Sequence, residues 1–198
     1  GEEGHLLYGG RCEKYDVRKK SGSTVPDLFS LRDRLLRKEY GEASPVKGVS
    51  SLTPHSSPKI GIPAIFYFHD FLPYWTTLIR NLGLEPVVSP ATDRSIIDSG
   101  SETVLSETCF PVKTALGHIR HLIHGGVDAV LVPSFVNLHA STNAFEAGFA
   151  CPYTQTIPYL ARTAFPEAQM LTPVVDRTRG QHHLVRELHR HLKHFGVR

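Results

Sequence analysis

Residues 59–68 read KIGIPAIFYF, a continuous apolar run of strand length that is rich in isoleucine and aromatic side chains. Such a run is typical of a strand that is buried on both faces, as the strands of parallel sheets are. Pro63 lies inside the run and indicates that the regular strand ends or becomes irregular there, because proline donates no backbone hydrogen bond. The stretch therefore predicts one strand of a parallel sheet.

Strands and helices alternate through the rest of the chain. Short apolar runs indicate the strands, and apolar residues three or four positions apart indicate the helices. We expect further strands at 85–89, 128–133 and 170–175, and helices at 72–82, 92–99, 108–124, 157–164 and 180–195. The predicted fold class is α/β: a parallel sheet of about four strands with helices on both faces, Rossmann-like or flavodoxin-like. In such folds ligands bind beyond the carboxyl ends of the strands.

The chain before residue 59 differs in character from the rest. A helix is expected to begin at Pro26-Asp27, and its buried face is expected to carry Leu28, Leu31, Leu35 and Leu36. Gly, Ser and Pro are frequent in residues 41–58, which predicts a linker. The expected organisation is an N-terminal segment 1–40 with Cys12 and a helix, the linker 41–58, and an α/β domain 59–198 with Cys109 and Cys151.

The composition argues against several classes of protein. A formal net charge of +3, from 22 basic and 19 acidic residues, is too small to indicate nucleic-acid binding. No apolar run approaches the roughly eighteen residues of a membrane helix, and the N-terminus does not resemble a signal peptide. The chain does not open with methionine, so we interpret it as a piece of a longer protein. Its sparse cysteines, described next, lead us to expect a cytoplasmic location.

Three cysteines lie far apart in the chain, at Cys12, Cys109 and Cys151. An odd and sparse set does not fit a disulfide-stapled secreted domain and favours a reducing compartment. Cys109 precedes Pro111 and Cys151 precedes Pro152, so both are expected at helix N-termini, where the helix dipole favours a thiolate. Both are also expected in loops at the edge of the sheet where ligands bind.

The chemistry of three such cysteines has more than one interpretation. Three thiolates suit a cubane iron–sulfur cluster that leaves one iron to a non-protein ligand. Zinc, held by three cysteines and a histidine or water, is the chemical rival. Three unrelated cysteines in the core or in loops are the third alternative, since free cysteine often acts as a small buried hydrophobic residue. The spacing contains no CxxC and does not choose between them. No GxGxxG or GxxxxGK[ST] nucleotide motif is found either.

A specific motif lies around Cys109. Glu107, Cys109 and the Pro111-Val112-Lys113 run are followed by Gly117-His118 and then by an apolar strand that ends at Pro133. With this pattern, the chain resembles the domain of unknown function found beside CoA-substrate-specific enzyme activases. It is also similar to the subunits of 2-hydroxyacyl-CoA (2-hydroxyglutaryl-CoA) dehydratases. The runs Gly9–Glu13 and Cys151-Pro152 resemble the same module.

The resemblance implies a 4Fe–4S cluster held by Cys12, Cys109 and Cys151. It implies that an ATP-dependent activase, in the same longer chain, supplies low-potential electrons, and that an acyl-CoA or another small acceptor receives them. The chain lacks the second half of a dehydratase subunit, so it would be a fragment of a dehydratase- or reductase-type enzyme. A homodimer is compatible with this interpretation. The alternatives are a non-catalytic interaction or assembly module and a zinc-binding regulatory domain.

Three further side chains are candidates for the surroundings of a cluster or ligand: Glu107, Lys113 and His118. Lys113 lies one helical turn after Cys109 and either supports a thiolate or is a plain surface lysine. Glu107 would be a base or a polar partner. His118, His121 and His124 lie three apart; they either bind a metal or, more simply, form a polar outer helix face.

Other polar and aromatic residues have mainly structural interpretations. The run that contains Ser134, Asn137, His139, Ser141, Thr142 and Asn143 is expected to be a polar loop, either lining a pocket or on the surface. Phe71, Tyr74 and Trp75 are expected to be core or interface residues. The histidines of the last helix are expected to face water, since Leu184, Leu188 and Leu192 take its buried side.

Overall fold

The computed structural model describes residues 26–41, 57–104, 106–138 and 148–197. Several sequence predictions lie outside these residues: Cys12, most of the linker 41–58, and the loop residues His139, Ser141, Thr142 and Asn143.

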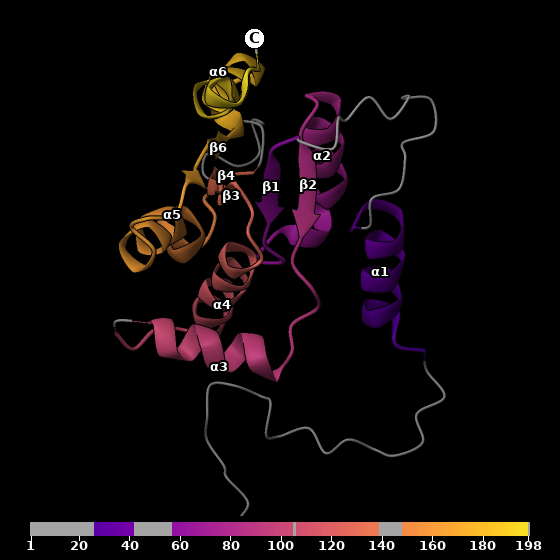
Figure 1. Ribbon diagram of the computed structural model, residues 1–198, viewed down its shortest axis with the longest axis vertical. Coiled ribbons are helices and arrows are strands. Elements are labelled where there is room, and N and C mark those ends of the chain that lie inside the picture. Colours follow the sequence, from indigo (N-terminus) through magenta and orange to yellow (C-terminus); the bar gives the residue numbers. More distant parts are fainter. Residues whose placement is uncertain (1–25, 42–56, 105, 139–147, 198) are drawn as a thin grey trace, which may run out of the picture.

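A four-stranded parallel sheet forms the centre of the protein (Figure 1). Its strands lie in the order β2-β1-β3-β5, and their bounds are β1 Lys59–Ile62, β2 Glu85–Val88, β3 Ala129–Leu131 and β5 Met170–Leu171. Ile60 pairs with Pro86 on one side and with Ala129 on the other. The predicted parallel α/β sheet is confirmed, and β1 ends directly before Pro63, where the sequence indicated a break.

A second, two-stranded parallel sheet extends the first. It pairs β4, Ser134–Asn137, with β6, Val174–Asp176. The prediction of a loop was therefore wrong for Ser134 to Asn137. The polar side chains of Ser134 and Asn137 are buried, and Ser134 Oγ donates a hydrogen bond of 2.7 Å to the carbonyl of Gln155. Partners from distant parts of the chain thus satisfy polar groups that a sequence would assign to solvent.

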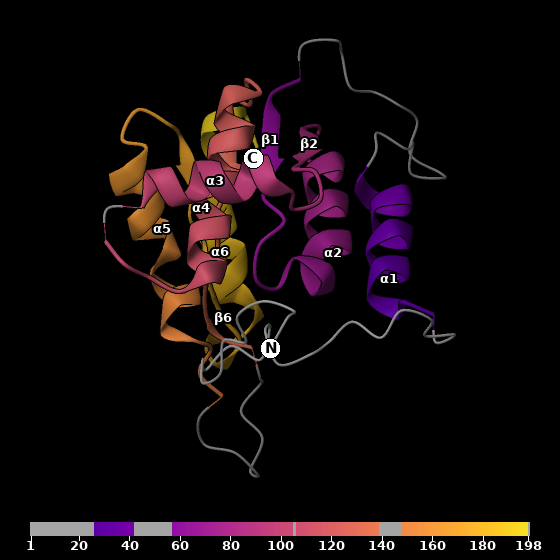
Figure 2. The same ribbon diagram turned by 90° about the horizontal axis from the view of Figure 1, so that it is seen from below.

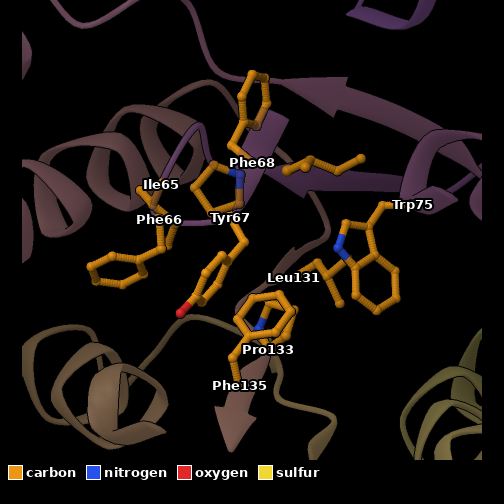
Figure 3. Close-up of a pocket in the computed structure, with 10 residues that line it drawn as sticks. Ile65, Phe66, Tyr67, Phe68, Trp75, Leu131, Pro133 and Phe135 are labelled. Atoms are coloured by element: carbon orange, nitrogen blue, oxygen red, sulfur yellow. The ribbon is translucent and has the colours of Figure 1, made fainter. Parts of the chain in front are cut away.

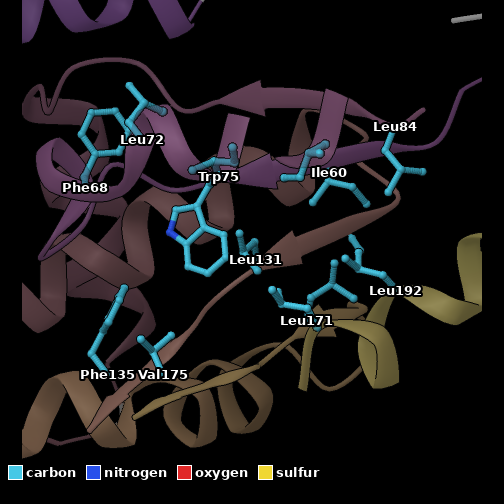
Figure 4. Packing of buried hydrophobic residues seen from close by; sticks show 14 residues of the cluster. Ile60, Phe68, Leu72, Trp75, Leu84, Leu131, Phe135, Leu171, Val175 and Leu192 are labelled. Atoms are coloured by element: carbon cyan, nitrogen blue, oxygen red, sulfur yellow. The ribbon is translucent and has the colours of Figure 1, made fainter. Parts of the chain in front are cut away.

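The helices form layers on both faces of the sheet. One apolar cluster joins α2 (Phe68–Asn81) and α6 (Gln181–Leu192) to one face, and Figure 4 shows Trp75, Leu131 and Leu192 in this cluster. A second cluster joins α4 (Phe110–His124) and α5 (Pro152–Ala164) to the other face. Helix α3 (Arg94–Thr103) packs on α4. The short helical turns are η2 (Arg37–Gly41), η3 (Arg177–Arg179) and η4 (Lys193–Phe195).

The N-terminal helix α1, Leu28–Leu36, lies beside α2 (Figure 1). It begins at Asp27, whose carboxylate accepts bonds from the amides of Phe29 and Ser30, so the predicted helix start is confirmed. Its predicted buried face was wrong for Leu28 and Leu35, which are 63% and 55% exposed, while Leu31 and Leu36 are partly buried and Leu36 packs against the core. Polar contacts also hold this helix: Asp33 bonds to His69 at 2.8 Å, and Arg37, in η2, donates to the carbonyl of Ser89 at 2.6 Å.

Helices α3 and α4 cross with their backbones in contact (Figure 2). A Cβ atom added at Gly117 would lie 2.0 Å from the carbonyl oxygen of Ile96, and one added at Gly100 would lie 2.0 Å from that of Lys113. Only glycine allows two backbones to approach this closely. The pair therefore sets the position of α4 relative to α3.

His118, next to Gly117, anchors α4 to the ends of two strands. Its side chain is completely buried, with Nδ1 2.9 Å from Ser89 Oγ and Nε2 3.0 Å from Thr92 Oγ1. Ser89 Oγ also accepts a bond from the amide of Ala64, just beyond β1. The prediction of a polar outer face was thus wrong for His118 and right for His121, which is exposed. Residues three apart are offset by about 60° around an α-helix, so His118 can face the core while His121 faces solvent.

Burial, followed by the positive charges of Arg37 and His121, lowers the pKa of His118 to about 4, against the opposing effect of Asp93. The imidazole is therefore neutral at physiological pH. A neutral ring, with one nitrogen donating and the other accepting, fits its two hydroxyl partners.

We expect Gly117→Ala to destabilise the fold by about 3 kcal/mol, because the new methyl group would overlap the Ile96 carbonyl and separate α3 from α4. Helix propensity alone would give the opposite sign, a gain of about 1 kcal/mol. Urea denaturation measures the difference. Gly41→Ala is the matched control, since its Cβ would meet Arg37 at an ordinary 3.4 Å and should change stability by less than about 1 kcal/mol.

The pH dependence of stability should contain a contribution from His118. Its folded pKa of about 4 lies below the ordinary 6.5, so the unfolded chain binds the proton more readily. This contribution is complete above about pH 6.5 and is lost as the pH falls towards 4, up to roughly 3 kcal/mol. Other groups also titrate there, so the measurement compares urea denaturation of the wild type with His118→Gln across this range. Parallel pH profiles for the two proteins would contradict the assignment.

Candidate functional site

Cys109 and Cys151 each precede a helix directly. Cys109 is the N-cap residue of α4 and Cys151 that of α5, and in both helices a proline follows within the first two positions. Both residues are exposed, and neither side chain makes a capping hydrogen bond. The two thiols are therefore free to bind a ligand, each at the start of a helix.

The two helix starts point towards the same edge of the sheet. Helix α4 leads through a short turn into β3, and α5 leads in the same way into β5. Because β3 and β5 are parallel neighbours, the starts of both helices lie at the carboxyl edge. The helices also pack against each other, as Figure 2 shows from below.

A cavity of about 170 Å³ lies between the segment before α4 and helix α5. Glu107 and Thr108, next to Cys109, line it from one side, and Tyr153, two residues after Cys151, lines it from the other. Val112 and Leu116 contribute apolar wall. The Thr108 hydroxyl oxygen is buried and has no hydrogen-bond partner within the described parts of the chain. Residues next to each thiol thus line one cavity, although neither cysteine is itself part of its lining.

The three residues predicted around a cluster occupy different positions. Lys113 and Glu107 pair with each other, with Nζ 3.1 Å from Oε2, and Glu107 is 94% exposed. The pair keeps the lysine charge in the first turn of α4, close to Cys109 in sequence. His118 lies further along α4, and both of its ring nitrogens already have hydroxyl partners. It therefore offers no free nitrogen to a metal in this arrangement.

Within residues 26–41, 57–104, 106–138 and 148–197, no group of three or more His, Cys, Asp or Glu side chains is placed to hold a metal ion. The described chain contributes the two thiols of Cys109 and Cys151, and the third predicted ligand, Cys12, lies outside it. The three-cysteine site therefore stays a prediction.

Aromatic side chains fill the central crevice of the edge. In doubly wound folds the usual ligand crevice lies where the strand order reverses, here between β1 and β3. Only about 20 Å³ is free there, and Tyr67, Phe68, Trp75 and Phe135 surround it (Figure 3). Phe66, in the same loop, adopts a left-handed backbone with φ 46°, which is rare for an aromatic residue. Trp75 is 4% exposed, as the core interpretation predicted.

Sequence analysis missed the polar junction between α1 and the carboxyl edge. Burial raises the pKa of Asp33, but hydrogen bonds from Arg37 and His69 outweigh it, so the pKa lies below its ordinary value. A groove of about 410 Å³ runs along this junction, between α1 and the loops that follow β1 and β2. The i, i+4 spacing of Asp33 and Arg37 was the available signal.

Among the described helices, none has the length and apolar character needed to cross a membrane. No curated protein and no solved structure matches the chain. The family model described as CoA enzyme activase uncharacterised domain (DUF2229) matches residues 59–198, from the start of β1 through α6. The chain therefore belongs to this family of domains associated with CoA enzyme activases.

Proposed function

We propose that this domain is the iron–sulfur redox module of an activase-linked enzyme, with a 4Fe–4S cluster held by Cys12, Cys109 and Cys151. One observation carries the proposal: Cys109 and Cys151 are exposed, uncapped thiols at the starts of two packed helices, and their neighbours line one cavity. Such a site sits at the carboxyl edge, where parallel α/β folds carry their ligands.

The surroundings of the two thiols fit an anionic metal–sulfur group. Each helix start directs the positive end of the helix dipole towards its cysteine. Lys113 adds a positive charge in the first turn of α4. Three thiolates leave one iron of a cubane for a non-protein ligand. The 170 Å³ cavity offers space for such a ligand.

When bound, such a cluster supplies single electrons at low potential. The chain's own residues would hold and tune it: the thiolates bind iron, Lys113 offsets negative charge, and Val112 and Leu116 restrict water on the cavity side. Electrons would come from an ATP-dependent activase, in line with the family's association with these enzymes. The acceptor would be an acyl-CoA or another small molecule that enters from the carboxyl edge.

Serine in place of each cysteine should reduce the iron bound after anaerobic reconstitution with iron and sulfide. We expect Cys109→Ser and Cys151→Ser each to lose most of the broad absorption near about 400 nm, because serine is a poor ligand for this cluster. Cys12→Ser tests the third ligand separately. Ser101→Ala, at an exposed position of α3 that does not line the cavity, should bind iron like the wild type.

The outcomes separate the alternatives. A colourless wild type that carries one zinc would replace the cluster with a zinc site, and a metal-free protein after reconstitution would favour an assembly module. Iron retained in both Cys109→Ser and Cys151→Ser would contradict the proposed ligands.

The charge pair beside Cys109 should tune the reduction potential of the reconstituted protein. Removing a positive charge disfavours the more negative, reduced cluster, so Lys113→Gln should lower the potential by on the order of tens of millivolts. Glu107→Gln should raise it by less, because Glu107 is almost fully exposed to solvent. Anaerobic redox titration measures both. Equal potentials in Lys113→Gln and wild type would place the cluster away from the start of α4.

A further inference from the structure

A second cavity, of about 420 Å³, lies on the opposite face of the sheet from the cysteine cavity, between α2 and the start of α6. Phe71, Tyr74 and Trp75 form its wall on α2. Val175 and Leu184 form the apolar wall on the other side. Its volume lies within the range of natural small-molecule sites, which are mostly apolar with a few polar groups. Its lining comes from α2, β6, η3 and α6, so it is separate from the cysteine site.

The α2 wall is made of aromatic rings at different depths. Trp75 is 4% exposed and Tyr74 is 42% exposed, so the first lies deep and the second lies near the surface. Their rings meet edge to face, with centroids 4.7 Å apart. Aromatic walls of this kind favour a flat ring, which can stack or meet them edge to face.

The polar side of the cavity carries an unbalanced positive charge. Asp176 is already occupied: it accepts bonds from the amide and the hydroxyl of Thr178 and pairs with Arg179 at 3.2 Å. Arg177 donates to the carbonyl of Leu138 at 3.3 Å, and no carboxylate in the described residues pairs with it. A guanidinium with spare N–H groups at the edge of an apolar cavity is suited to a carboxylate or phosphate.

We propose that this cavity binds a small molecule that combines a flat aromatic ring with one anionic group. The ring lies against Phe71, Tyr74 and Trp75, and the anion lies at Arg177. The uncapped first turn of α6 supports the same charge, since its N-cap residue, Gly180, has no side chain to occupy the first amides. A neutral ring would leave the arginine charge uncompensated, and an anion without a ring would leave the aromatic wall exposed to water.

Trp75 is the only tryptophan of the chain, so its fluorescence reports directly on this cavity. Titration of the full 198-residue chain with benzoate and with adenosine monophosphate tests the carboxylate and phosphate sources. At least one should change the emission saturably with a Kd below about 1 mM. Benzyl alcohol and adenosine, which lack the anion, should bind about tenfold more weakly or worse, and inorganic phosphate alone should not change the emission.

A pair of variants tests the position of the anion. Arg177→Gln should weaken binding of the responding anion by about tenfold, while Arg186→Gln, an exposed α6 arginine that does not line the cavity, should bind like the wild type. Circular dichroism confirms that both variants fold. The proposal is overturned if neither anion changes the Trp75 emission at about 10 mM. It is also overturned if the neutral analogues bind equally well, or if Arg177→Gln binds as tightly as the wild type.

Discussion

The backbone contact between α3 and α4 sets the geometry of the carboxyl edge. Gly100 and Gly117 bring the two helices so close that a single Cβ atom would overlap a carbonyl oxygen. This contact places His118 against Ser89 and Thr92, which follow β2. Helix α4 is thus fixed both to α3 and to the end of a strand. This gives Cys109, the N-cap residue of α4, a defined position at the edge. Packing alone thus accounts for the position of the Gly-His pair of the motif.

The carboxyl edge contains separate environments because helices on both faces begin there. The cavity between the segment before α4 and helix α5 lies on the face covered by α4 and α5, and the cavity walled by Trp75 lies on the face covered by α2 and α6. Aromatic side chains fill the crevice between β1 and β3. The central crevice is therefore nearly full, and the larger cavities lie on the two faces of the sheet. One domain thus has room for two different ligands.

The sequence predicted the sheet well because a parallel strand is buried on both faces and so leaves a local signal, such as KIGI before Pro63. It predicted the positions of the two cysteines because a proline after a cysteine marks a helix start. It failed where burial depends on distant partners. The position of His118 depends on residues 26 and 29 positions away, and the strand that begins at Ser134 depends on β6. The cavity shared by Glu107, Thr108 and Tyr153 is likewise a product of tertiary packing.

The capping residues of this chain give an argument for the importance of the two thiols. Aspartate side chains cap α1, α3 and η3, so the chain uses the strongest type of cap at three of its helix starts. Helices α4 and α5 begin instead at cysteines that make no capping bond, which forgoes about 1 kcal/mol at each helix. Helices α4 and α5, which both lack a capping bond, pack against each other, and residues of both line one cavity. A ligand bound by both sulfurs would compensate for the missing capping bonds, since it would satisfy the helix dipoles with the negative charge of two thiolates.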